Sequence, residues 1–177
     1  MNTRMNKYIG SLTLIVLTLF SIRVDAADRP IRIGVSGGQT RIENEATQQY
    51  QDATQVGVVV GVDLFKARGT ILGAEIKYDQ TTTKKDVTDT GTMTTSNYEA
   101  EQTGLFITGR TAGAFYGKLK LGAINRKVTV NDLITTDETK GAAGIGIGLD
   151  TGTGGVMELE YTAYSNNITI FSINYLY

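Results

Sequence analysis

Residues 56–65 read Val-Gly-Val-Val-Val-Gly-Val-Asp-Leu-Phe, and their alternation decides how the rest of the chain is interpreted. Successive side chains of a β-strand point to opposite faces, so this stretch would present two unlike surfaces. The branched apolar face would consist of Val56, Val58, Val60, Val62 and Leu64. The other face would consist of Gly57, Val59, Gly61, Asp63 and Phe65. Such a strand belongs in a wall between two different environments.

The same alternation recurs along the chain. Residues 66–69 form a short turn, and 70–80 alternates again, so the two segments predict a β-hairpin. The alternation along the whole chain predicts eight strands, at 29–40, 54–65, 70–80, 97–109, 114–127, 140–150, 155–165 and 168–177. No segment has a convincing helical apolar stripe.

Two of the predicted strands change phase. In the fourth, Tyr98 and Leu105 fit opposite alternations, so we expect a β-bulge near Gln102 to reconcile them. In the eighth, Ile170 is out of phase with Phe171.

The connections between strands alternate in length. The expected long, polar connections are 41–53, 81–96 and 128–139, and the expected short ones are 66–69, 110–113 and 151–154. Long loops at one end and tight turns at the other are typical of outer-membrane barrels. Eight of residues 81–96 are Thr, so we expect this loop to be mobile and to extend beyond the membrane.

Alternation alone leaves open which face is outside. A soluble ligand-binding barrel buries its apolar face, whereas a membrane barrel turns it toward lipid. Charges of both signs fall in mid-strand on the other face and could neutralise one another in a narrow lumen: Arg32, Lys77, Lys118, Lys120 and Arg126 with Asp63, Glu75, Glu158 and Glu160. Aromatic side chains fall at strand ends on the apolar face: Tyr78, Tyr98 and Tyr161 near the long loops, and Phe115, Tyr175 and Tyr177 near the short turns. The charges favour the membrane barrel, because a charge on the lipid face would be costly. The aromatic side chains favour it too, because aromatic rings gather at membrane interfaces.

The N-terminal segment has the parts of a secretory signal peptide. Arg4 and Lys7 supply positive charge, residues 9–22 form an apolar run, and Ala26 ends a cleavage site. The expected domains are therefore a signal peptide at 1–26 and an outer-membrane barrel at 27–177.

The charge balance argues against nucleic acid as a partner. The chain has 17 Lys and Arg and 18 Asp and Glu; removing residues 1–26 takes away three basic side chains and one acidic one, which leaves 14 and 17, a net charge of −3. A nucleic-acid-binding domain would carry a basic excess. The chain also has no Cys, so an exported domain would have no disulfide to support it.

The C-terminal strand is the most specific single feature. Phe171, Ile173, Tyr175 and Tyr177 alternate up to the last residue, a pattern similar to the C-terminal signal that the outer-membrane assembly machinery reads. With the stretches 141–150 and 157–161, it resembles the small eight-stranded outer-membrane β-barrel family of the OmpA transmembrane domain, OmpX and opacity-protein type. The resemblance implies an all-β, antiparallel, up-and-down transmembrane barrel in the Gram-negative cell outer membrane, in contact with lipid and lipopolysaccharide.

No residue pattern predicts catalysis, a cofactor site or a metal site. The chain has no His, which removes the usual base and a common metal ligand. The pairs Glu99 with Glu101 and Glu158 with Glu160 could each share a strand face, but salt-bridged lumen charges explain them better. The alternating Gly144, Gly146 and Gly148 predict close packing in the lumen rather than a phosphate loop, because no helix follows them.

The sequence therefore predicts a non-enzymatic surface protein, most simply a monomer. Its barrel would anchor loops that contact a host, another cell or lipopolysaccharide, although the binding residues are unknown. Two alternatives remain open at this point: a narrow channel for ions or small solutes, and a soluble periplasmic ligand-binding barrel.

Overall fold

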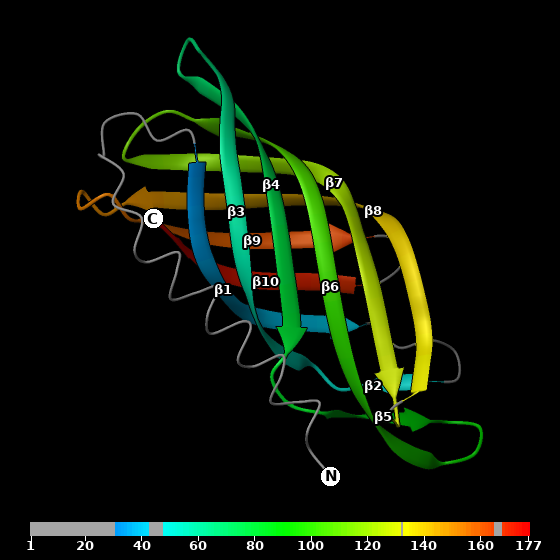
Figure 1. Ribbon diagram of the computed structural model, residues 1–177. Helices are drawn as coiled ribbons and strands as arrows, with labels where there is room; N and C mark the ends of the chain where they lie inside the picture. The colour runs from blue at the N-terminus through cyan, green and yellow to red at the C-terminus, as the bar shows by residue number, and fades with distance from the viewer. Residues whose placement is uncertain (1–30, 43–47, 132, 165–167) are drawn as a thin grey trace.

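The computed structural model describes residues 31–42, 48–131, 133–164 and 168–177. The strands are β1 (Ile31–Ile42), β2 (Gln48–Tyr50), β3 (Ala53–Ala67), β4 (Thr70–Thr81), β5 (Lys85–Asp89), β6 (Thr94–Thr111), β7 (Phe115–Val130), β8 (Leu133–Asp150), β9 (Val156–Tyr164) and β10 (Ile168–Leu176). All but the short β2 and β5 form one closed antiparallel ring (Figure 1). The predicted eight-stranded antiparallel barrel is confirmed, while the predicted signal peptide lies outside the described residues. Within those residues, no helix is long and apolar enough to cross a membrane.

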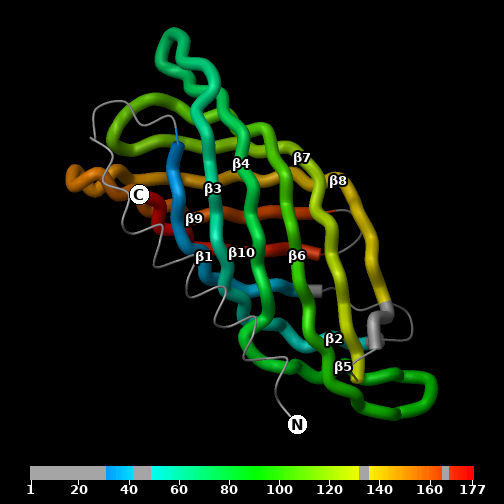
Figure 2. The backbone as a smooth tube through the Cα atoms, in the orientation of Figure 1, coloured from blue at the N-terminus to red at the C-terminus, as the bar shows by residue number. Residues whose placement is uncertain are grey.

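The ring closes by pairing the two ends of the described chain. Its order is β1, β3, β4, β6, β7, β8, β9 and β10, and β10 pairs again with β1 (Figure 2). At this seam a Cβ on Gly34 would lie 2.0 Å from the carbonyl oxygen of Tyr175, so the close approach requires glycine. Because every ring strand pairs on both sides, the wall satisfies its backbone polar groups without water.

The wall separates an apolar outer surface from a largely polar interior. Ile107 and Leu121 are 72% and 66% exposed, whereas Lys118 and Glu160 are only 3% and 2% exposed. An apolar outer surface of this extent suits hydrocarbon rather than water. The alternative of a soluble barrel with its apolar faces turned inward is therefore wrong.

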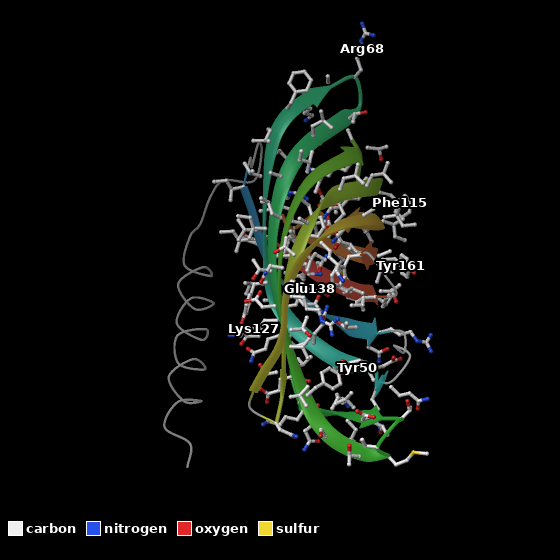
Figure 3. All side chains as sticks on the ribbon, turned by 90° about the vertical axis from the view of Figure 1, so that its right-hand side faces the viewer. Tyr50, Arg68, Phe115, Lys127, Glu138 and Tyr161 are labelled. Carbon is white, nitrogen blue, oxygen red and sulfur yellow. The ribbon has the colours of Figure 1, made fainter. Side chains whose placement is uncertain are left out.

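Most of the aromatic side chains that were predicted to face lipid do so. Those on the outer face are Tyr78, Phe115, Tyr161, Tyr175 and Tyr177, of which Phe115 and Tyr161 are labelled in Figure 3. Tyr98 is the exception, because it is fully buried inside the barrel.

The expected bulge near Gln102 is absent from β6. The pairing of β6 with β4 runs without a shift from Thr70–Thr111 to Gln80–Glu101. Tyr98, Gln102 and Phe106 all point inward and are buried. The prediction was wrong because it assumed that every apolar side chain faces lipid, whereas a cluster of apolar side chains also packs inside the lumen at this end.

A bulge does occur in β3, where the register with β4 shifts between Asp63 and Phe65. It turns both Leu64 and Phe65 outward, and they are 68% and 61% exposed. The sequence pattern placed these two side chains on opposite faces. That prediction was wrong at Phe65, because an extra residue in a strand inverts the alternation beyond it.

The short turns are confirmed, but two of the three long loops are largely strand. β8 begins three residues after β7 ends, so residues 128–139 form the tip of a long hairpin. Within 81–96, β5 pairs with the start of β6 from Lys85–Tyr98 to Asp89–Thr94. The predictions of irregular loops there were wrong, because paired strands with polar side chains on both faces leave no alternation to detect.

The two ends of the barrel are therefore unlike. At the turn end, Arg68 and Gly69 connect β3 to β4 with φ values of 43° and 81°, the two-residue turn that suits strand twist. Arg68 lies at the tip of this hairpin (Figure 3). At the loop end, the extensions of β6, β7 and β8 and the short strands β2 and β5 stand beyond the other strands (Figure 1).

Candidate functional site

The centre of the lumen holds one lysine among three carboxylates. The Lys118 Nζ atom of β7 lies 2.5 Å from Glu75 of β4, and 2.8 Å and 2.6 Å from Glu158 and Glu160 of β9. All four side chains are buried, so these ion pairs are not screened by water. Strand alternation brings them together, because each is an inward position on its own strand.

Further charges extend this network in both directions. Lys120 lies 2.6 Å from Glu160, and Lys77 donates hydrogen bonds to Ser172 and Asn174 at 2.8 Å and 3.2 Å. Toward the turn end, Asp63 bridges Arg32 at 3.1 Å and Arg110 at 2.6 Å, and Arg32 also reaches Glu158 at 3.4 Å. The predicted neutralisation of lumen charges is confirmed for these residues, whereas Arg126 forms no ion pair with a described carboxylate.

The glycines of β8 make room for this network. A Cβ on Gly148 would lie 2.2 Å from the Tyr116 ring, and a Cβ on Gly144 would lie 2.7 Å from the Lys120 side chain. Tyr116 in turn donates a hydrogen bond to Glu158. The prediction of close lumen packing at these glycines is thus confirmed.

The three carboxylates around Lys118 also have the spacing of a cation site. One oxygen from each of Glu75, Glu158 and Glu160 lies within 4.8 Å of the others. The ammonium group of Lys118 already contacts all three, so it stands where a cation would bind. Glu158 and Glu160 are therefore salt-bridged lumen residues, as predicted. The same prediction was wrong for Glu99 and Glu101, which lie on the outer face of β6, where Glu99 faces Lys84 at 4.0 Å.

Above the charged layer, toward the loop end, the lumen holds an apolar layer that the sequence pattern did not predict. Its members are Ala53, Val87, Tyr98, Ala100, Phe106, Ile124, Val128, Ala142, Tyr164, Ile168 and Ile170. Tyr50 packs edge-on against Tyr98 with 5.3 Å between ring centroids, and Tyr98 donates a hydrogen bond of 2.5 Å to the Gln51 carbonyl oxygen. The sequence feature that could have indicated this apolar layer was the change of phase at Tyr98 and Ile170, whose side chains point inward.

The loop end carries a projecting sheet, which we define as β2, β5 and the parts of β6, β7 and β8 beyond the barrel. A row of outward polar residues crosses it, through the register partners Gln80, Glu101, Lys127 and Asp137. The outward row on its barrel side already contains Thr103, Asn125 and Thr139, so the apolar outer band ends before the projecting sheet, whose outer face suits water.

One edge of the projecting sheet is open. β8 pairs with β9 only from Ala142 to Asp150, and in the described part of the chain no strand pairs with that side of 133–141. At the far tip, the backbone N–H groups of Thr92 and Gly91 donate to Asp89 at 3.0 Å and 2.8 Å. These hydrogen bonds hold the pKa of the Asp89 carboxyl below its usual value and fix the turn.

Comparisons with known proteins agree with this geometry. The attachment invasion locus protein Ail of Yersinia pestis matches with a TM-score of 0.54 and 10% identity, over 82% of this chain and 93% of Ail. Neisserial surface protein A matches with a TM-score of 0.52 and 5% identity, over 84% of this chain and 95% of that chain. No curated protein sequence matches this chain. The family model of the outer membrane protein β-barrel domain matches residues 12–174, and the chain belongs to this family.

Proposed function

We propose that this chain is an exported, non-enzymatic surface protein whose projecting sheet binds a partner outside the cell. In this proposal residues 1–26 are a cleaved signal peptide, and 27–177 form the barrel in the cell outer membrane. The turn end faces the periplasm and the loop end faces outward. The packed, charge-paired lumen supports an anchoring role for the barrel rather than a transport role.

The open edge of β8 is the observation that carries this proposal. Alternate residues of 133–141 direct backbone donors and acceptors to a side where no described strand pairs with them, along about 30 Å at roughly 3.3 Å per residue. An exposed strand edge of this kind can accept an added strand from another protein. Pairing through the backbone would supply affinity, and side chains such as Asp137 and Lys140 would restrict the choice of partner.

The charge of the loop end favours a basic partner. The segments 41–53, 81–101 and 127–140 together contain five Lys and Arg and ten Asp and Glu. Ail has been solved in complex with the heparin analogue sucrose octasulfate. A polysulfated ligand is disfavoured in this chain, because its loop end carries a net negative charge.

Shortening one hairpin tests the proposal. Replacing 128–136 by Asn-Gly joins the register partners Lys127 and Asp137 directly and removes the outer part of the β8 edge. The matched control replaces 87–96 by Asn-Gly, which joins Asp86 to Asn97 and leaves β8 intact.

Bacteria that display each variant would be tested for adhesion to epithelial monolayers, and folding would be checked by the gel mobility of unboiled against boiled protein. We expect the β8 variant to fold and to lose adhesion, and the control to keep it. Added polylysine should compete with adhesion, whereas heparin should not. Full adhesion by the β8 variant would remove the proposal.

A further inference from the structure

The amine of Lys77, on β4, contacts a carboxamide in the lumen. Its Nζ atom donates hydrogen bonds to Asn174 Oδ1 at 3.2 Å and to Ser172 Oγ at 2.8 Å, and both acceptors belong to β10. All three side chains are at most 5% exposed. An amine and an amide carbonyl are therefore held in contact inside the barrel, away from bulk water.

The charge around Lys77 differs from that around the other lysines of the lumen. The closest described carboxylate oxygens belong to Asp79 at 3.8 Å and to Glu160 at 4.0 Å. By comparison, Lys118 and Lys120 each lie 2.6 Å from Glu160. A buried ammonium group without such a contact is poorly compensated, and it can give up its proton to a nearby carboxylate.

Asp79 is placed to take that proton. It is the next inward residue of β4 after Lys77, and its carboxylate lies over Gly57, where an added Cβ would come within 2.4 Å of Asp79 Oδ1. The glycine lets this carboxylate reach across β3 and accept a hydrogen bond from Ser36 of β1. Ser36 is in turn the register partner of Asn174. The carboxylate, the amine and the carboxamide therefore lie together, although β3 and β1 separate β4 from β10 in the ring.

The nitrogen of the Asn174 carboxamide is the unexplained polar atom of this cluster. Asn174 Nδ2 is buried and has no hydrogen-bond partner among the described residues, although an amide nitrogen carries two donors. Its departure would break no hydrogen bond and would remove an unsatisfied buried group. A cavity of about 10 Å³ beside Lys77 and Asp79 has room for one molecule of the size of water or ammonia.

We propose that Lys77 and Asn174 join in an isopeptide bond that links β4 to β10 across the lumen. Asp79 accepts a proton from the Lys77 ammonium group, and the neutral amine attacks the carbon of the Asn174 carboxamide. As the new C–N bond forms, the bond to Asn174 Nδ2 breaks. The leaving nitrogen takes one proton from the attacking amine and one from Asp79, and it departs as an ammonium ion. Asp79 is then ionised again, and the reaction consumes no oxidant.

This bond would lock the seam at which the ring closes. β3 and β1 lie between β4 and β10, so a link between the outer two encloses the pairing of β1 with β10. The chain has no Cys, so a disulfide cannot supply such a link. A cross-link between residues far apart in sequence also restricts the unfolded chain.

Intact-mass spectrometry of the barrel, folded and purified in detergent and then denatured, tests the proposal. We expect the wild type to lack the mass of one ammonia molecule, and its protease digest to contain a branched peptide that joins Lys77 to Asn174. Lys77→Arg should have the full mass, because a guanidinium keeps the charge but is a poor nucleophile. Asn174→Ser should also have the full mass, since it has no carboxamide. Lys120→Met is the matched control and should keep the mass loss, because Lys120 is equally buried but pairs with Glu160.

Asp79→Asn tests the carboxylate, because it keeps both bonded partners. We expect this variant to form the bond severalfold more slowly than the wild type after refolding from urea, as followed by the cross-linked fraction over time. Formation at the wild-type rate would overturn the role of Asp79.

Two results would overturn the bond itself. One is the full mass in the folded wild type. The other is a mass loss that persists in Lys77→Arg, because a succinimide at an asparagine loses the same mass without a lysine. If Lys77→Arg hinders folding, Asn174→Ser and the branched peptide of the wild type decide the question.

Discussion

Replacing Lys118 by Met should destabilise the barrel more than any other single charge removal in the lumen. The change keeps most of the side-chain volume but removes the ammonium group that contacts Glu75, Glu158 and Glu160 at 2.5–2.8 Å. Three buried carboxylates would then face one another without the cation between them. Removing one partner of a buried ion pair costs about 3–5 kcal/mol, and we expect the free energy of unfolding to fall by that amount.

Urea unfolding in lipid vesicles, followed by the gel mobility of unboiled protein, measures this change. Lys127→Met is the control, because Lys127 is on the same strand but on the outer face, where losing a lysine should cost less than about 1 kcal/mol. The second change Glu160→Gln should restore part of the lost stability in the Lys118 variant. The reasoning is refuted if both lysine variants unfold alike, or if Glu160→Gln destabilises the Lys118 variant further.

The other predictions concern the apolar layer, the lumen glycines, conduction and the hairpin tip. Tyr98→Phe keeps the buried ring but loses one hydrogen bond, so it should cost about 1 kcal/mol in urea unfolding, whereas Tyr98→Ala should cost about 3–5 kcal/mol. Gly148→Ala should cost about 1–3 kcal/mol, because its Cβ would collide with the Tyr116 ring, and an unchanged unfolding midpoint would contradict this. Planar bilayers that contain the wild type should show no stable conductance steps, since two packed layers fill the lumen. The lowered pKa of Asp89 means that its hydrogen bonds stabilise the tip fully above about pH 4 and are lost as the pH falls through the lowered value. Hydrogen exchange of the Gly91 amide should quicken over that range, and Asp89→Ala should abolish the dependence.

The candidate site could be predicted only in part. The sequence supplied the lumen charges and their signs, since Lys118, Glu158 and Glu160 alternate with apolar neighbours. It could not show that one ammonium meets three carboxylates, because that depends on which strands face each other across the barrel. The open β8 edge was also beyond prediction, since 133–141 has no apolar face and its pairing is set by backbone hydrogen bonds alone.

The sequence by itself determined the eight strands of the ring and the two unlike faces of its wall, because side chains alternate strictly and the two faces of a strand such as 157–161 differ in polarity. Which face is outside was settled only by the burial of the charged side chains in the closed barrel. Only the tertiary structure decided where that rule fails. Phe65 faces outward because a bulge inverts the alternation, and Tyr98 faces inward because it packs in a cluster of apolar side chains inside the lumen at the loop end. Which inward residues meet, and how far each strand continues beyond the membrane, follow from the register and closure of the whole ring, and these are properties that no single segment carries.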